Sequence, residues 1–303
     1  MGKAGYMEKI NETAITAPIA LEDMEFVKKS KQEADKYDWL YHCTTVEAML
    51  NMIKSKEVWL SNLKVVNDSE EANRIDAKEY EKAYYVVCFT YDDDIPDEHW
   101  HEYGQSKQKV LFGMRKSWFE KNIYFLNVDH SKNDEEIFRI LNSCKEAFDY
   151  QMKNASAGKI VSAPYYVIDF GFYKIIYSDE LKKNMQSKTI WNIDGGGLIG
   201  DAIVFGIPGI IKSTHGMCCR NGKEPYEKNW ESEKEVRLKI GVFTENKEIR
   251  KSGLFFRQMA VKLNQTAFDE LPIKFCPEMT GEDKARVIAQ IKDELPETKI
   301  YEI

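Results

Sequence analysis

Residues 230–243 constrain the fold most, because their sequence, WESEKEVRLKIGVF, places acidic residues where a strand is expected to begin. Successive side chains of an extended strand point to opposite faces, so Glu233, Glu235 and Arg237 are predicted to share one face. Val236 then belongs to the other face. A face with two carboxylates and a guanidinium is either a solvated strand with ion pairs or the floor of a polar cleft. A cleft requires partners from other segments of the chain.

The composition is that of an ordinary globular protein. The chain has 303 residues, of which 43% are hydrophobic and 31% charged, and it is long enough to bury a sizeable core. The formal net charge of −7 argues against a protein that wraps nucleic acid through a globally basic surface. No run of about 18 apolar residues is present, residues 1–12 are polar and charged, and no two cysteines have C-x-x-C spacing. We therefore expect a cytoplasmic protein with reduced thiols and no membrane partner.

The order of apolar runs predicts an α+β fold with mixed, mainly antiparallel sheets and flanking helices. Residues 1–36 are expected to form a helical N-terminal extension, and residues 37–303 a single domain. Strands are predicted over residues 39–43, 57–61, 83–90, 109–114, 123–128, 165–169, 173–177, 236–243, 254–263, 271–276 and 299–303. Helices are predicted over residues 46–53, 67–82, 100–104, 134–154 and 280–295, and a broken helix over 202–211.

Several short motifs are weak signals of chemistry. Gly195–Gly200 satisfies G-x-G-x-x-G, but it lacks the preceding strand and the acidic residue about 20 positions later, so a loop, or a lid over a cleft, is favoured over a dinucleotide site. His99 and His101, and His215 before two cysteines, lack the further ligands that a metal site needs. We predict no metal. The acidic run Asp92–Asp94 is interpreted as a solvated loop, with cation binding as the alternative.

Five further segments together resemble a bacterial family of unknown function. They are Tyr41-His42-Cys43-Thr44, Asn67-Asp68, Cys88-Phe89-Thr90, Trp100-x-x-Tyr103-Gly104 and Trp230-x-x-Glu233-x-Glu235-x-Arg237. The resemblance covers about residues 39 to 295. Cys43 stands where the family often has an aromatic residue, and Thr90 where it often has serine.

That family is in turn similar to the ADP-ribosyltransferase superfamily, and the similarity implies roles for these residues. Glu235 would be the catalytic glutamate, Glu233 the first acid of a Glu-x-Glu pair, and Thr90 part of the nicotinamide pocket. NAD would be bound by side chains of the early and middle segments, namely Tyr41, His42, Thr44, Trp100 and Tyr103. Arg237 would pair either with the NAD pyrophosphate or with Glu235 itself.

The resemblance therefore implies an ADP-ribosyltransferase-like protein that uses NAD as co-substrate and has an ADP-ribosyltransferase-like fold. Cleavage of the nicotinamide–ribose bond develops positive charge on the ribose, which a carboxylate stabilises. The acceptor would be a protein or a nucleic acid, and the setting that of a toxin or phage-defence effector with an antitoxin or defence-system partner. Two alternatives stay open, namely NAD hydrolysis and a non-catalytic module that binds a nucleotide or a protein.

Overall fold

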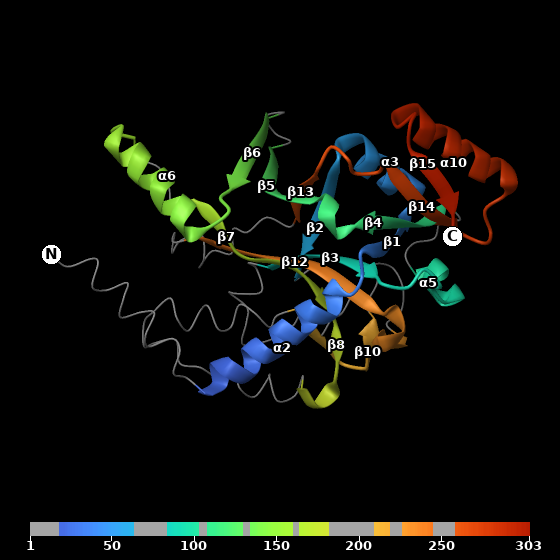
Figure 1. Ribbon diagram of the computed structural model, residues 1–303, viewed down its shortest axis with the longest axis horizontal. Coiled ribbons are helices and arrows are strands. Elements are labelled where there is room, and N and C mark those ends of the chain that lie inside the picture. Colours follow the sequence, from blue (N-terminus) through green and yellow to red (C-terminus); the bar gives the residue numbers. More distant parts are fainter. Residues whose placement is uncertain are drawn as a thin grey trace.

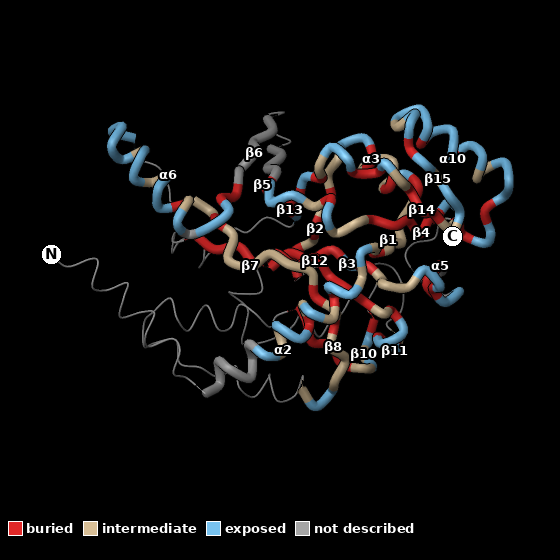
Figure 2. The backbone as a smooth tube through the Cα atoms, viewed as in Figure 1, coloured by how far each residue is buried: buried red, intermediate tan, exposed pale blue. Residues whose placement is uncertain are grey.

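The central element is strand β12 (Glu235–Thr244), which is buried along its whole length. One edge of β12 pairs antiparallel with β3 (Tyr84–Thr90) and the other with β7 (Tyr165–Lys174). Figure 1 shows β12 crossing the middle of the molecule, and Figure 2 shows the buried backbone there. This computed structural model describes residues 18–63, 84–102, 108–129, 134–159, 164–181, 209–218, 226–244 and 258–303.

The strands form an 11-stranded sheet with the order β15-β14-β4-β1-β3-β2-β13-β5-β6, from which β12 and β7 branch at β3. Its other members are β1 (Trp39–Thr45), β2 (Glu57–Asn62), β4 (Lys109–Arg115), β5 (Phe119–Asp129), β6 (Asp134–Ile140), β13 (Gln258–Leu263), β14 (Glu270–Phe275) and β15 (Lys299–Glu302). Neighbouring strands pair antiparallel except β14 with β15, which pair in parallel. The predicted α+β class with a mixed, mainly antiparallel sheet is confirmed.

Two small sheets lie outside the large one. Strands β8 (Ile176–Tyr177) and β9 (Ile211–Lys212) pair in parallel, and β10 (His215–Cys218) pairs antiparallel with β11 (Tyr226–Asn229). Strand β8 follows β7 and β11 precedes β12 through short segments, so the small sheets bring residues 209–218 and 226–233 next to the start of β12.

The helices lie at the periphery of the sheet (Figure 1). They are α2 (Pro18–Asp35), α3 (Val46–Ser55), α5 (Asp97–Glu102), α6 (Cys144–Ser156) and α10 (Gly281–Glu294), with 3-10 turns at η4 (Lys116–Trp118) and η6 (Trp230–Glu233). Helix α2 lies along β7, and its Phe26 and Val27 pack against the buried cluster that contains Tyr173 of β7. The hydroxyl groups of Thr45 and Thr280 accept backbone N–H groups at the starts of α3 and α10, as expected of N-cap residues.

Two predicted boundaries were wrong. Residues 134–140 form strand β6 instead of the first half of a helix, because they pair with the long edge of β5 from Asp129↔Asp134 to Ile123↔Ile140. The helix that follows, α6, begins after the N-cap Ser143. The two strands predicted around Gly171 are the single strand β7 and the short β8, and Gly171 allows the Lys31 side chain of α2 to approach the sheet.

Some predicted segments lie outside the described residues, namely the polar helix 67–82, the glycine loop Gly195–Gly200 and most of the apolar run 202–211. Within the described part of the chain, no helix combines the length and apolar character needed to cross a membrane.

The close packing of β4 makes a first prediction. A Cβ added at Gly113 would lie 2.5 Å from Pro272 Cγ and 3.0 Å from Trp39 Cε3. We expect Gly113→Ala to lower the free energy of unfolding by about 1–3 kcal/mol, the usual cost of overpacking. The matched control is Gly281→Ala at the start of α10, where nothing lies within 4 Å of an added Cβ, and which should leave stability unchanged or slightly raised. Urea denaturation measures both, and equal effects would contradict the packing.

Candidate functional site

The backbone before β12 is not extended, which corrects the predicted face. Residues Trp230–Glu233 form the 3-10 turn η6, and Lys234 has a left-handed conformation with φ 47°. The strand begins only at Glu235, so Glu235 and Arg237 share a face while Glu233 approaches from the turn. Glu233, Glu235 and Arg237 are 7%, 3% and 1% exposed, respectively. The solvated-strand alternative is therefore wrong.

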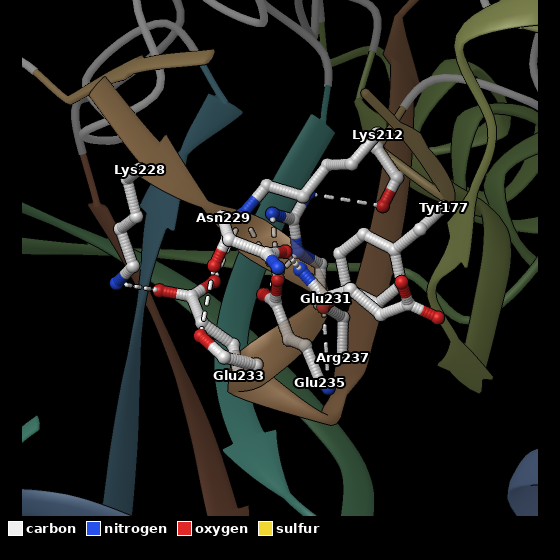
Figure 3. A network of polar contacts seen from close by, with 10 residues as sticks. Tyr177, Lys212, Lys228, Asn229, Glu231, Glu233, Glu235 and Arg237 are labelled. Carbon is white, nitrogen blue, oxygen red and sulfur yellow. Dashed lines mark hydrogen bonds and ion pairs between the residues drawn. The ribbon is translucent and has the colours of Figure 1, made fainter. Parts of the chain in front are cut away.

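Two cations hold the Glu235 carboxylate. Its Oε1 lies 2.5 Å from Arg237 Nε, and its Oε2 lies 3.3 Å from Arg237 Nη2 and 3.1 Å from Lys212 Nζ. The remaining arm of the guanidinium, Nη1, donates to the carbonyl oxygen of Gly209 at 3.0 Å. Figure 3 shows these side chains converging from β9 and β12.

The same lysine also holds Glu233. Lys212 Nζ lies 3.1 Å from Glu233 Oε2, and Lys228 Nζ lies 2.7 Å from Glu233 Oε1. Both ammonium groups lie over the Trp230 ring, at 4.2 Å and 5.0 Å from its centroid. Positive and negative charges thus alternate through five buried side chains, which we call the ion-pair chain: Lys228, Glu233, Lys212, Glu235 and Arg237 (Figure 3).

Burying five charges is energetically demanding. Removing ions from water costs several kcal/mol each, and the loss of one partner from a buried pair typically destabilises a protein by about 3–5 kcal/mol. Apolar residues of similar volume would stabilise the folded protein at least as well as these ion pairs. Such a chain is therefore a candidate functional site, since buried titratable groups with specific charge partners concentrate at sites of chemistry.

Strand register brings three of the sequence motifs together. Thr90 on β3 is directly opposite Glu235 on β12 and directly opposite Tyr41 on β1. Directly opposed residues of antiparallel strands point to the same face, so all three lie on the face that carries the ion-pair chain. Tyr41 packs in a small apolar cluster with the buried Trp100 of α5. Tyr41 and Thr90 are both partly exposed.

Cys88 marks the exposed side of Glu235. It lies opposite Arg237 on β3, so its side chain is on the same face as Glu235, and it is exposed. The strands on both sides of β3 nevertheless take hydration from the Cys88 thiol and raise its pKa, and the Glu235 carboxylate raises this pKa further. A carboxylate offers about four acceptor positions. A ligand hydroxyl that enters beside Cys88 could therefore donate to the Glu235 carboxylate.

His42 lies on the other side of the sheet. It follows Tyr41 on β1, so its side chain points to the opposite face. The His42 ring lies 5.5 Å from the Phe89 ring and 6.0 Å from the Phe112 ring, and its Nδ1 is 2.9 Å from the carbonyl oxygen of Cys88. Burial lowers the pKa of His42 against the opposing effect of this hydrogen bond. The ring is thus suited to donate to Cys88 as a neutral imidazole.

Two predicted residues remain, Thr44 and Tyr103. Thr44 is two positions after His42 on β1, so its side chain lies on the same face as that of His42, away from the ion-pair chain, and it is partly exposed. Tyr103 lies outside the described residues. The structure therefore gathers Tyr41, Thr90, Glu233, Glu235 and Arg237, with Trp100 beside Tyr41, and separates His42 and Thr44 from them.

Lys212, Lys228 and Tyr177 belong to the site but carried no sequence signal. Lys212 follows two isoleucines at the end of an apolar run, and no motif includes it. The Tyr177 hydroxyl lies 3.4 Å from the backbone nitrogen of Glu235. Burial raises the pKa of Tyr177 well above its ordinary value, and the Glu235 carboxylate adds to this effect.

Further along β12, the same face carries a second ion pair, between Lys239 and Asp169. Lys239 is fully buried, and its Nζ lies 3.2 Å from Asp169 Oδ2, while the Tyr173 hydroxyl donates to Asp169 Oδ1 at 2.5 Å. Burial lowers the pKa of Lys239, and the nearby Asp169 carboxylate opposes this. Lys31 from α2 lies 3.5 Å from the same carboxylate. Helix α2 therefore contributes to the surroundings of the charged face.

The acidic run after β3 is bound to lysines. Asp92 pairs with Lys234, and Asp94 Oδ1 lies 3.6 Å from Lys274 Nζ. The Lys234 side chain lowers the pKa of Asp92 through their hydrogen bond. Over the described ranges, no three His, Cys, Asp or Glu side chains are grouped as metal ligands.

In comparisons with protein-family models, with curated proteins and with solved structures, no match to this chain was found.

The effect of the Glu235 charge on Cys88 makes a second prediction. Replacing the carboxylate with an amide, Glu235→Gln, should lower the pKa of the Cys88 thiol, because the negative charge that opposes the thiolate is removed. Iodoacetamide should then alkylate Cys88 several-fold faster at pH 8, since the thiolate is the nucleophile. Peptide mass spectrometry separates Cys88 from the other cysteines.

The matched control for this prediction is Glu231→Gln, which removes an exposed carboxylate from the turn η6 just before β12. Its alkylation rate at Cys88 should equal that of the wild type. A Glu235→Gln variant that is folded and alkylates at the wild-type rate would show that the Glu235 charge does not act on the thiol.

Proposed function

We propose that this chain is an ADP-ribosyltransferase-like protein that binds NAD and cleaves its nicotinamide–ribose bond at Glu235. One observation carries the proposal: the Glu235 carboxylate is directly opposite Thr90, on the face shared with Tyr41, with the exposed Cys88 at its side. The family resemblance assigns roles to three of these residues: Glu235 is the catalytic glutamate, Thr90 is part of the nicotinamide pocket, and Tyr41 binds NAD. An ADP-ribosyltransferase-like fold is part of the same proposal.

The chemistry asks for a charged carboxylate beside the ribose. As the bond to nicotinamide breaks, the bonding electron pair leaves with nicotinamide and positive charge develops on the ribose. Lys212 and Arg237 contact the Glu235 carboxylate and hold it in place. That carboxylate would accept a hydrogen bond from a ribose hydroxyl. An acceptor nucleophile then bonds to the ribose carbon and releases its proton.

The structure favours one of the two roles considered for Arg237. Its Nε and Nη2 contact Glu235, and its Nη1 contacts the carbonyl oxygen of Gly209. A guanidinium held on these three nitrogens positions Glu235 and leaves pyrophosphate binding to other groups. The partly exposed ring of Tyr41 is the aromatic surface beside Thr90 on which a nicotinamide or adenine ring would stack.

A non-catalytic nucleotide-binding module is the second candidate. The contacts that the Glu235 carboxylate already makes inside the protein favour it. Three charged contacts occupy a carboxylate that is only 3% exposed, which suits a carboxylate that fixes the architecture. Calorimetry with NAD separates the candidates, because binding without turnover supports the module. The absence of NAD binding would remove both.

The test of catalysis is Glu235→Gln. We expect it to lower the rate of NAD consumption by about 100-fold or more, the magnitude typical of losing a charge-stabilising group in a transition state. Glu231→Gln, at an exposed position in the turn η6 just before β12, should keep the wild-type rate. Circular dichroism must show both variants folded. Equal NAD consumption by folded wild type and Glu235→Gln would refute the proposal.

Transfer of ADP-ribose and hydrolysis of NAD differ in where the ADP-ribose group ends. With NAD labelled in its adenine, transfer leaves the label on a macromolecule, whereas hydrolysis leaves free ADP-ribose. Sensitivity of the labelled product to protease or to nuclease then identifies a protein or a nucleic-acid acceptor. The setting as a toxin or phage-defence effector with an antitoxin partner stays a prediction from the resemblance.

A further inference from the structure

We propose that Lys212 is the positioning residue that makes Glu233 and Glu235 act as one unit, an inference that rests on the proposed function of Glu235. Lys212 Nζ lies 3.1 Å from an oxygen of each carboxylate. Arg237 pairs with Glu235, and Lys228 pairs with Glu233, whereas Lys212 pairs with both. It is therefore the link between the two halves of the ion-pair chain.

The backbone around Lys212 is fixed on several sides. Strand β9 pairs in parallel with β8, with Tyr177 opposite Lys212, and the Lys212 carbonyl accepts the N–H of Ser178 at 2.9 Å. The preceding Ile211 packs in a buried cluster with Tyr173. With its ammonium over the Trp230 ring and 3% of the residue exposed, Lys212 has little freedom to move. A charge held so firmly can set the position of a carboxylate.

The charge of Lys212 is needed because the two carboxylates are near neighbours. An oxygen of each lies 3.1 Å from the same nitrogen. Without the ammonium, like charges would face each other in a buried site, and the two carboxylates would move apart. That displacement removes the fixed Glu235 carboxylate that the proposed chemistry requires.

This assignment changes the role of Glu233. Both of its oxygens are held by lysines, Oε1 by Lys228 and Oε2 by Lys212. We therefore infer that Glu233 acts through Lys212 by balancing its charge, and that it is a positioning residue, whereas the sequence suggested a catalytic one.

The test is a pair of substitutions whose effects depend on each other. Glu233→Gln in the wild-type background should lower both the free energy of unfolding and NAD turnover, because it leaves Lys228 without a counter-charge and breaks the Lys212–Glu233 pair. In the Lys212→Met background the same change should lower both quantities less, with a loss of turnover at least about threefold smaller, because the Lys212–Glu233 pair is already absent there. Lys212→Arg, which keeps the charge, should retain more turnover than Lys212→Met.

The difference between the two backgrounds separates a charge role from a packing role. If Lys212 acts only by filling space, Glu233→Gln lowers unfolding free energy by the same amount in both backgrounds, which would overturn the inference. If Lys212→Met does not fold, Lys212→Arg keeps the inference testable: Glu233→Gln should lower unfolding free energy there as much as in the wild type, and a smaller loss would overturn the inference. A smaller effect of Glu233→Gln on unfolding in Lys212→Met, while no protein consumes NAD, would keep the charge link and reject the proposed function.

Discussion

The ion pairs on one face of β12 are the interaction on which the rest of the site depends. The other face of this strand, with Val236, Leu238 and Ile240, packs into the main core and fixes the strand between β3 and β7. With the backbone held in this way, the charges at Glu235 and Arg237 cannot reach bulk water and must be compensated inside the protein. Lys212 from β9 and Glu233 from the turn η6 complete that compensation.

The position of the site follows from how β3 is shared. Strand β12 occupies one edge of β3 from Tyr84 to Thr90, so β2 and β1 share the other edge, pairing around Val86 and at Thr90. Between these two strands the carbonyl oxygen of Cys88 is contacted by His42, and the Cys88 side chain is exposed on the opposite face. The branching of the sheet thus creates an exposed position directly beside a buried carboxylate. That combination lets a buried charge meet a ligand.

Local sequence was sufficient for much of the fold and for part of the site. Apolar runs and N-cap residues located β3, β12 and α10, since burial and capping depend on neighbouring residues. Strand β6 could not be predicted, because the edge of β5 decides its conformation. The left-handed Lys234 could not be predicted either, because lysine is not a residue type that favours φ 47°. Lys212 contacts Glu235 across 23 positions and belongs to no motif, so its role is visible only in three dimensions.

The proposed function requires above all that NAD binds on the face where Glu235 and Thr90 meet, beside Cys88. Protection of Cys88 from alkylation tests that claim most directly, because the thiol lies on the exposed side of Glu235. Saturating NAD should slow alkylation of Cys88 by about tenfold or more, as expected when a ligand covers the thiol, while the rate at a cysteine elsewhere in the chain stays constant. An unchanged rate at Cys88, under conditions where calorimetry shows NAD bound, would contradict the account.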